Sequence, residues 1–368
     1  MTISQRDRAV AARLFAAFLD AGAVPVEADI LQPAETLLDL YGETIRHRAY
    51  VTADPVRGEQ MLRPDFTVPV VQMHMAGGAE PARYAYAGEV FRKQEAGVER
   101  PREFLQVGYE VFDGADPAAA DAEVFALLRA QFGAIPTRPV IGDIAILRAA
   151  ISGLSTTDER KAALRRHIWR PRRFRALLDR FGGRLPVPEG RRALARAVAD
   201  RGVAEVLAAH GPDMGLRSPA EVLARVETLQ ADLAAPPIPA AEVAVLEDIS
   251  RLRESAPMAL ERLRDLAVDI PELTPALDGL EARLDALAAL GQTPETLEFD
   301  GTYGRASLEY YDGFVFGIFA RARPHMAPVA SGGRYDALTA VLGQGRAIPA
   351  VGGVIRPGLL AQLEEART

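Results

Sequence analysis

Residues 83–112 read RYAYAGEVFRKQEAGVERPREFLQVGYEVF. Apolar and polar side chains alternate over 83–92 and again over 103–112, which is the pattern of two half-buried β-strands. The segment between them contains Gly97, Pro101 and several charges. Because such residues favour loops over regular structure, we expect an antiparallel hairpin with a long loop.

Further helices and strands are expected on both sides of this hairpin. Before and directly after it, we expect helices over 1–20 (ending near Gly22), parts of 34–48 and 60–75, and 117–132, with strands over 49–52 and 140–141. Toward the C-terminus, we expect strands over 296–300, 307–320, 326–331 and 350–355, and helices over 336–342 and 357–366. Gly332 and Gly333 are expected to open a loop.

The middle of the chain has a different composition. It is dense in Ala, Leu, Arg, Glu and Asp, and its apolar residues recur at helical spacing over 191–209, 219–234, 240–267 and 275–290. Strands on both sides of a helical middle indicate an α+β domain interrupted by an α-helical insertion. We therefore expect a core formed by 1–150 and 296–368, with the insertion at 151–295.

Composition excludes several classes of protein. The 368 residues include no cysteine, which removes disulfide scaffolds, thiolate chemistry and the usual structural zinc sites. The net charge of -7 argues against a general nucleic-acid coat, because phosphate binding needs clustered positive charge. No stretch reaches the ~20 apolar residues that span a bilayer, and Met1 to Phe18 has charges throughout. We therefore expect a cytoplasmic protein that has no membrane partner.

The usual catalytic signatures are absent. The sequence has no Walker motif, no GxGxxG after a strand, no GxSxG elbow and no HExxH among its five histidines. We therefore predict no catalytic residue, no cofactor and no metal.

One group of polar residues stands out on the predicted strands. Buried acids, amides and arginines must be paired or they cost several kcal/mol each, so a sheet that carries them is either a ligand pocket or an interface. Acids suit an amino group or an imidazole N–H, and arginine suits a carboxylate or a phosphate. Gln106 and Glu110 share one face of their strand, whereas Glu103 falls on the other. The group also includes Arg63, Asp65, Thr67, Glu89, Arg92, Tyr310, Tyr311 and Tyr335.

Four segments resemble the catalytic core of the histidyl-tRNA synthetase family. They are LRPDFT at 62–67, GEVFR at 88–92, RPREFLQVGYE at 100–110 and GGRYD at 332–336. The resemblance covers roughly 35–112 and 296–362. It implies a class II synthetase-like antiparallel or mixed sheet flanked by helices, and self-association as a dimer through the region near 35–70.

The same resemblance implies a histidine-binding pocket. Asp65 and Thr67 would hold the α-amino group, and Arg92 the carboxylate. Glu110 and the tyrosines would contact the imidazole, with Tyr311 rather than Tyr310 facing inward. The full predicted set is Asp65, Thr67, Arg92, Gln106, Glu110, Tyr311 and Tyr335.

The chain departs from an active synthetase at three places. The family's RGLDYY segment is here ASLEYY, so that Ala306 replaces an arginine, while Arg305 would point to the opposite face of a strand. Gln94 replaces a glutamate, and Gly358 and Leu359 replace a Glu-Arg pair. Losing an electrostatic stabiliser costs about 10²–10³ in rate, so two such losses should leave little adenylation.

The sequence also ends soon after this last motif, so we expect no anticodon-binding domain. It thus resembles the regulatory subunits of ATP phosphoribosyltransferase. That resemblance implies a hetero-oligomer with the short catalytic subunit, and feedback inhibition by L-histidine in the first step of histidine biosynthesis. The alternative is a truncated histidyl-tRNA synthetase paralogue that still adenylates histidine or acylates another molecule.

Residues 160–184 are rich in arginine and contain Trp169, the single tryptophan. Such a segment can bind RNA, contact an acidic partner, or form a solvated helix face. All three interpretations stay open from sequence, with nucleic acid the least favoured.

Overall fold

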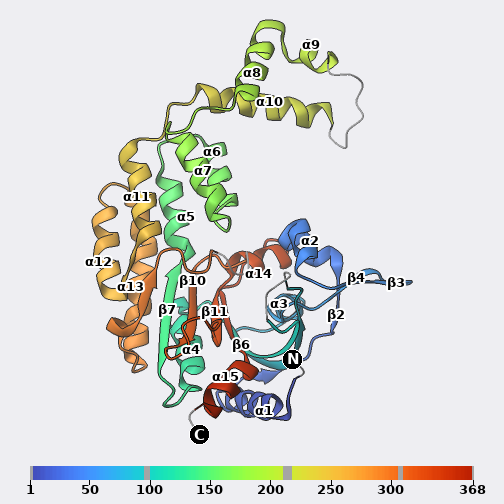
Figure 1. Cartoon of the computed structure of the whole chain (residues 1–368), viewed down its shortest axis with the longest axis vertical. Helices are drawn as coiled ribbons and strands as arrows, with labels where there is room; N and C mark the ends of the chain where they lie inside the picture. The colour runs from blue at the N-terminus through green and yellow to red at the C-terminus, as the bar shows by residue number, and fades with distance from the viewer. Residues whose placement is uncertain (1–2, 95–99, 210–217, 306–309, 367–368) are drawn as a thin grey trace. The chain divides into compact units, whose positions relative to one another are not determined.

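The computed structural model describes residues 3–94, 100–209, 218–305 and 310–366 (Figure 1). The chain divides into two compact units, which are described separately. Unit 1 comprises 1–146, 251–263 and 275–368, and unit 2 comprises 147–250 and 264–274. The helix α5 (Ile144–Gly153) begins in unit 1 and ends in unit 2.

Unit 1 is built on a large sheet, in which nine strands of the described residues hydrogen-bond in the order β1-β5-β6-β12-β11-β10-β7-β9-β8. Neighbours are antiparallel except for the β1–β5 and β7–β9 pairs. A mixed sheet of this kind, flanked by helices, agrees with the α+β prediction. In chain order the strands are β1 (Val24–Pro25), β5 (Ala82–Phe91), β6 (Glu103–Phe112), β7 (Thr137–Asp143), β8 (Arg253–Ser255), β9 (Glu298–Asp300), β10 (Phe314–Ala320), β11 (Ala330–Arg334) and β12 (Ala350–Ile355).

The predicted hairpin of β5 and β6 is confirmed. The two strands pair along their whole length, with Gly88 opposite Gln106 and Tyr84 opposite Glu110. On its other edge β6 pairs with β12, where Gly352 lies opposite Glu110. The long hairpin therefore places Gln106 and Glu110 near the middle of the sheet.

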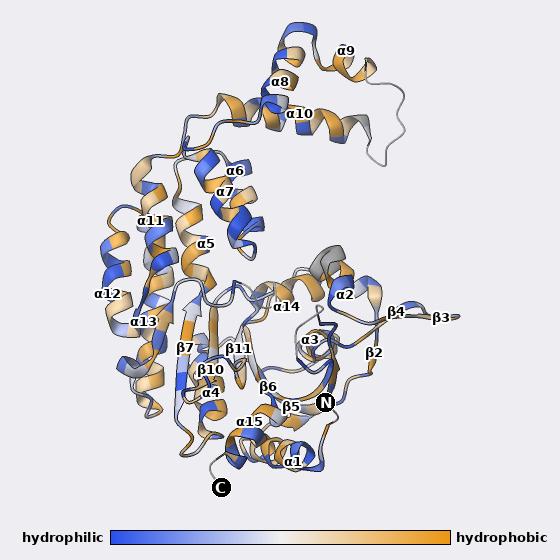
Figure 2. Cartoon of the chain, in the orientation of Figure 1, coloured by the Kyte–Doolittle hydropathy of each residue, from blue (hydrophilic) through white to orange (hydrophobic). Residues whose placement is uncertain are grey.

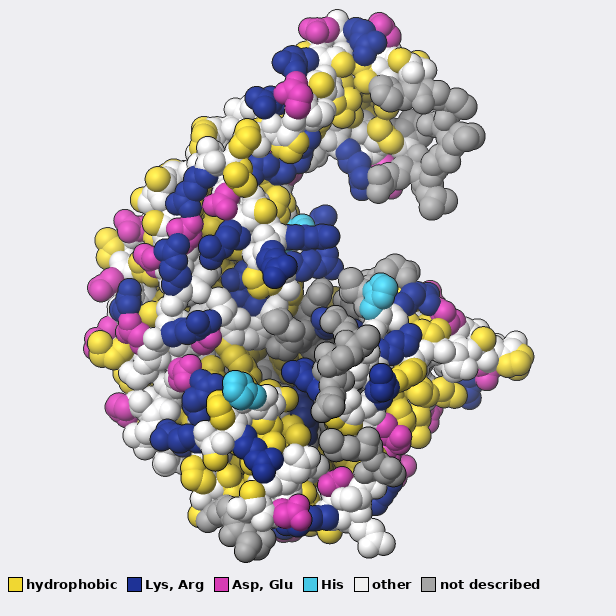
Figure 3. Space-filling model, viewed as in Figure 1, with side chains coloured by type: hydrophobic (Ala, Val, Ile, Leu, Met, Phe, Trp, Pro, Cys, Tyr) yellow, Lys and Arg dark blue, Asp and Glu magenta, His cyan; other side chains and the backbone are white. Residues whose placement is uncertain are grey.

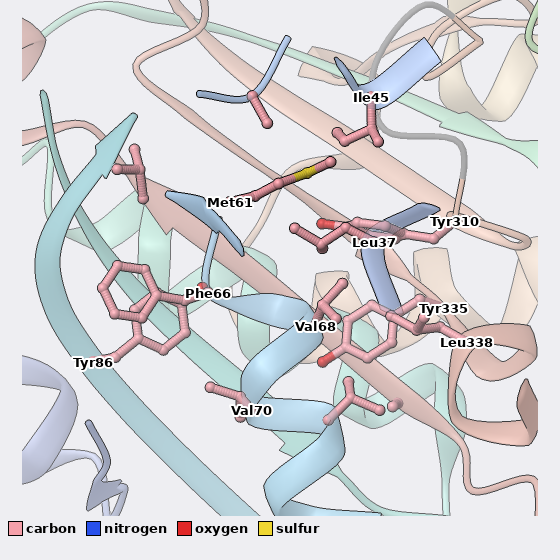
Figure 4. Close-up of a cluster of buried hydrophobic side chains, with 14 of the residues drawn as sticks. Leu37, Ile45, Met61, Phe66, Val68, Val70, Tyr86, Tyr310, Tyr335 and Leu338 are labelled. Carbon is pink, nitrogen blue, oxygen red and sulfur yellow. The ribbon is translucent and has the colours of Figure 1, made fainter. Parts of the chain in front are cut away.

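A second, three-stranded sheet within the described residues has the order β2-β4-β3. Its strands are β2 (Leu31–Pro33), β3 (Val51–Asp54) and β4 (Gly58–Leu62), and it lies beside α2 (Ala34–Tyr41), η1 (Gly42–His47) and α3 (Thr67–Met75). Apolar side chains of these elements pack with aromatic residues of the large sheet (Figure 4). The Phe66 ring stacks on Tyr86 with centroids 4.4 Å apart. This core fixes the segment that carries Asp65 and Thr67.

Helices cover the sheet of unit 1 (Figure 1). They include α1 (Gln5–Asp20), α4 (Pro117–Ala130), α14 (Asp336–Leu342) and α15 (Pro357–Glu365). A capping box between Ser4 and Asp7 begins α1, and Leu14 and Phe18 on its inner face are fully buried. The helix spanning 1–20 was therefore predicted correctly.

Unit 2 is helical, with apolar and polar residues interleaved along its helices (Figure 2). Its helices include α6 (Asp158–Arg166), α7 (Pro171–Phe181), α8 (Glu189–Arg201), α9 (Val203–Ala208), α10 (Pro219–Ala234) and most of α11 (Ala240–Arg251). The helix expected over 191–209 is broken at Gly202, whose φ of +81° favours glycine.

The single helix expected over 240–267 is wrong. The helix α11 ends at Arg251, β8 follows at the edge of the large sheet, and α12 (Ala256–Leu266) begins a new helix. The next helix, α13 (Thr274–Ala289), clusters mainly with unit 1. Helical spacing alone misses β8 because a three-residue strand has too little pattern to detect.

Two predictions near the C-terminus also need correction. The strand β10 begins at Phe314, so Tyr310 and Tyr311 precede it rather than lying on it, and 307–309 fall outside the described residues. Gly332 and Gly333 lie inside β11 and do not open a loop. A Cβ added to Gly332 would lie 2.3 Å from the Gly352 carbonyl oxygen, so close strand packing requires glycine there.

Across the described residues, no helix is long and apolar enough to cross a membrane.

Candidate functional site

A pocket of about 1490 Å³ lies within unit 1, over the part of the sheet formed by β6, β11 and β12. Five of the seven predicted histidine-binding residues line it: Asp65, Thr67, Arg92, Gln106 and Tyr311. Glu110 and Tyr335 do not line the pocket but lie buried behind its wall. The fold therefore brings together residues from four separate sequence segments.

Glu110 accepts three hydroxyl hydrogen bonds behind this wall. Its carboxylate receives bonds from Thr67 Oγ1 at 3.0 Å, Tyr86 OH at 2.9 Å and Tyr335 OH at 2.5 Å. Burial raises the pKa of Glu110 to about 7, although the three hydrogen bonds favour the ionised form. Glu110 thus fixes the pocket-facing Thr67. Tyr86, which the sequence reasoning did not single out, belongs to this group of hydrogen-bonded residues.

Asp65 and Gln106 provide buried polar groups that face the pocket. Asp65 lies between β4 and α3 and is 4% exposed. Gln106 on β6 is 1% exposed, and its Oε1 atom has no hydrogen-bond partner among the described residues. A buried amide oxygen without a partner carries a desolvation cost that a ligand N–H would remove.

Arg63, in the same motif as Asp65, has a structural role. Its Nε donates to the Glu89 carbonyl oxygen at 2.7 Å, its Nη1 donates to the Ala28 carbonyl oxygen, and its guanidinium lies 4.1 Å from the Phe66 ring centroid. Arg63 therefore joins the loop before α3 to the edge of the large sheet.

Among the described residues, five arginines line the pocket, and two of them, Arg92 and Arg356, are not fully exposed. Arg92 follows β5, and Arg356 connects β12 to α15; both are half-buried and both line the cavity. The sequence reasoning treated the segment around Arg356 only as a motif that had lost residues, and so it missed this side chain. Gly358 and Leu359, at the start of α15, also line the pocket and bring no charged side chain to it.

Tyr310 and Tyr311 both line the pocket, with ring centroids 4.8 Å apart. The prediction that only Tyr311 faces inward is therefore wrong. Alternation between two faces applies to strands, and this segment ends before β10 begins. Arg305 is likewise in a turn, and it is buried. Ala306 lies outside the described residues.

The sequence profile of the histidyl-tRNA synthetase family matches residues 3–255 and 224–357. Two similar curated proteins, from Brucella ovis and Brucella abortus, are named ATP phosphoribosyltransferase regulatory subunit. Each is 34% identical over 341 residues, covering 89% of this chain and 89% of the relative. This chain belongs to the family of ATP phosphoribosyltransferase regulatory subunits. The predicted family is confirmed.

Solved structures support the same fold for this regulatory-subunit family member. A Bacillus halodurans protein titled ATP phosphoribosyltransferase regulatory subunit/histidyl-tRNA synthetase matches with a TM-score of 0.68 at 21% identity, covering 98% of this chain and 79% of that one. A histidine–tRNA ligase subunit from Alicyclobacillus acidocaldarius matches with a TM-score of 0.60 at 23% identity, covering 99% and 94%. The predicted class II synthetase-like fold is confirmed.

In this family member, Gly332 of the GGRYD segment lines the pocket, and Tyr335 and Arg334 make buried contacts behind it. Tyr335 holds Glu110, whereas Arg334 forms ion pairs with Asp121 at 2.7 Å and Asp336 at 3.0 Å. Asp121 also pairs with Arg283 of α13 at 2.7 Å. This buried network fixes α13 and the start of α14 to the core of unit 1.

The arginine-rich segment 160–184 in unit 2 is partly neutralised. The segment contains one acid, Asp179, but two acids from outside it also pair with its arginines. Asp232 pairs with Arg160 at 2.7 Å and with Arg180 at 3.7 Å, and Glu247 pairs with Arg184. Other arginines of this segment are exposed, and basic side chains gather over α6 and α7 (Figure 3). They include Arg165, Arg166, Arg172, Arg173 and Arg175.

Proposed function

We propose that this chain is a non-catalytic subunit that raises the activity of the short catalytic subunit of ATP phosphoribosyltransferase and senses L-histidine in its pocket. The observation that carries this proposal is a pocket whose charged lining residues include the buried Asp65 and the half-buried Arg92 and Arg356, in a member of the regulatory-subunit family. A small zwitterion matches that charge pattern.

Feedback inhibition requires that histidine bind two states of the assembly with different affinity. A ligand can shift an equilibrium only by the difference between its affinities for the two states. We propose that the complex of this chain with the catalytic subunit exists in an active and an inactive arrangement. Histidine in the pocket would favour the inactive one.

We propose that the chain performs no adenylation. Gln94 replaces an acid and Leu359 replaces an arginine of an active synthetase, and Ala306 removes a second arginine. The alternative, a synthetase-like enzyme, predicts histidine-dependent pyrophosphate exchange. Exchange above background with the purified chain would favour that alternative. Dimerisation through 35–70, assembly as a hetero-oligomer and location in the cytoplasm stay predictions.

The test is the phosphoribosyltransferase activity of the same organism's short catalytic subunit, measured with and without this chain and then with added L-histidine. We expect activation by the chain and reversal by histidine. An unchanged rate, together with no co-elution of the two chains, would contradict the proposal. A catalytic subunit that is activated but insensitive to histidine would contradict the sensing part alone.

A further inference from the structure

The two half-buried arginines that line the pocket, Arg92 and Arg356, have only neutral hydrogen-bond partners among the described residues. Arg92 Nε donates to the Pro64 carbonyl oxygen at 2.8 Å. Arg356 donates to the Pro328 carbonyl oxygen at 2.6 Å and to Ser331 Oγ at 3.2 Å. Among the described residues, no carboxylate forms an ion pair with either guanidinium. These contacts therefore fix the position of two positive charges without neutralising them.

The surroundings of Arg356 increase the cost of its charge. Burial, together with the nearby guanidinium groups of Arg92 and Arg100, lowers the pKa of Arg356 to about 10. Like charges held together at a half-buried site are unfavourable unless an anion joins them. The acids that line the same cavity are Asp7, Asp65 and Glu103. None of them pairs with Arg356, and Asp7 is part of the Ser4 capping box.

The backbone around Arg356 holds the side chain in place. Its amide donates to the Val329 carbonyl oxygen at 2.9 Å, and Pro357 begins α15 directly after it. Gly358 and Leu359, in the first turn of α15, also line the pocket, so the positive end of this helix lies toward the same region. A charge that is held rigidly binds an anion at a lower entropic cost than a flexible one does.

A second observation favours a ligand that also carries a hydrogen-bond donor. Gln106 Oε1 is buried against the pocket and has no hydrogen-bond partner in the described part of the chain. An anion alone cannot satisfy this acceptor, whereas the ammonium group of an amino acid can. We propose that Arg356, together with Arg92, binds the α-carboxylate of an amino acid whose ammonium group lies toward Asp65 and Gln106. This inference rests on the proposed function and names the residue that would confer its ligand specificity.

Calorimetric titration of the purified full chain with L-histidine and with histamine, which lacks the carboxylate, tests this inference. In the wild type, we expect L-histidine to bind at least about tenfold more tightly than histamine, because a charge-assisted hydrogen bond contributes about 1.5–3 kcal/mol. In Arg356→Gln this preference should fall by several-fold, because only Arg92 then binds the carboxylate, and histamine affinity should be unchanged. Arg356→Lys should restore part of it, since the positive charge is retained. Arg321→Ala, which removes an exposed arginine outside the pocket, is the matched control and should behave as wild type.

The possible failures are distinguishable. If the wild type binds no L-histidine, the proposed function fails and this inference fails with it. If L-histidine binds and Arg356→Gln keeps the wild-type preference over histamine, only this inference is overturned. Inorganic phosphate is a further probe. Phosphate binding that Arg356→Gln abolishes, with histidine binding unchanged, would show that the arginines serve a phosphate and would overturn the carboxylate assignment.

Discussion

The hydroxyl of Tyr335 lies 2.5 Å from Oε2 of Glu110, although 225 residues separate them in the sequence. Glu110 is on β6, and Tyr335 lies between β11 and α14, so this bond joins the two sequence segments of the sheet behind the pocket. Thr67 and Tyr86 complete the ring of donors around the carboxylate. The pocket wall therefore depends on one buried acid.

We predict that Glu110→Gln changes the pH dependence of stability. The folded pKa of about 7 lies above the ordinary glutamate value of 4.5, so the folded state binds the proton more tightly. The contribution of the protonated Glu110 carboxyl group to the free energy of unfolding is therefore fully present below pH 4.5, and it is lost as pH rises through 7. At ~1.4 kcal/mol per pKa unit, the loss is ~3 kcal/mol. Relative to wild type, the variant should gain in Tm between pH 5 and pH 8. Parallel melting curves over this range would contradict the prediction.

We predict that Gly352→Ala damages the pocket wall. A Cβ at this position would lie 1.4 Å from Oε2 of Glu110, so the carboxylate must move and lose hydroxyl partners. We expect a loss of stability and weaker L-histidine binding, measured by thermal unfolding and calorimetry. Gly279→Ala is the matched control, because nothing lies within 4 Å of its Cβ and it sits within α13. That control should stabilise the chain by ~0.5–1 kcal/mol. Equal effects of the two substitutions would contradict the account.

We predict that Asp121→Ala strongly destabilises unit 1. It removes the common partner of Arg283 and Arg334, whose side chains are both at most 8% exposed. Each arginine keeps one carboxylate partner, Asp143 for Arg283 and Asp336 for Arg334, but the Nε donors of both lose their acceptor. A hydrogen bond to a charged group contributes ~1.5–3 kcal/mol, so we expect a total cost of ~3 kcal/mol or more. By contrast, Arg262→Ala breaks an exposed pair with Glu254 and should cost under ~1 kcal/mol. Urea unfolding of both variants measures the difference. A cost for Asp121→Ala no larger than that for Arg262→Ala would be inconsistent with this role.

The sequence was sufficient to predict those strands and helices whose structure follows from a local pattern of apolar and polar residues. Alternation over 83–92 and 103–112 predicts β5 and β6 because both strands have long, clear periods. The pattern fails at Gly332 and Gly333, which suggest a turn. Both residues lie in β11, where the neighbouring groups are too close to leave space for a Cβ atom. It also fails at Tyr310 and Tyr311, because a strand was assumed where a non-strand segment leads into β10.

The candidate site was predictable only in part. Motif resemblance identified five residues that line the pocket, since their spacing carries information about a shared ancestor. It did not identify Arg356 or Tyr86, because their roles depend on contacts with residues distant in sequence, such as Ser331 for Arg356 and Glu110 for Tyr86. It also placed Glu110 and Tyr335 among the residues that face the pocket. The two side chains are instead buried and hydrogen-bonded to each other, which a local sequence pattern cannot show.

The most direct test of histidine sensing uses the reconstituted complex of this chain with the short catalytic subunit. Phosphoribosyltransferase activity is followed as L-histidine is added, with wild type, Asp65→Asn and the control Arg321→Ala. Asp65→Asn removes the negative charge proposed to hold the ammonium group. We predict equal activation by all three chains, and inhibition that needs at least about tenfold more histidine with Asp65→Asn only. Inhibition of all three complexes at the same histidine concentration would contradict sensing through this pocket.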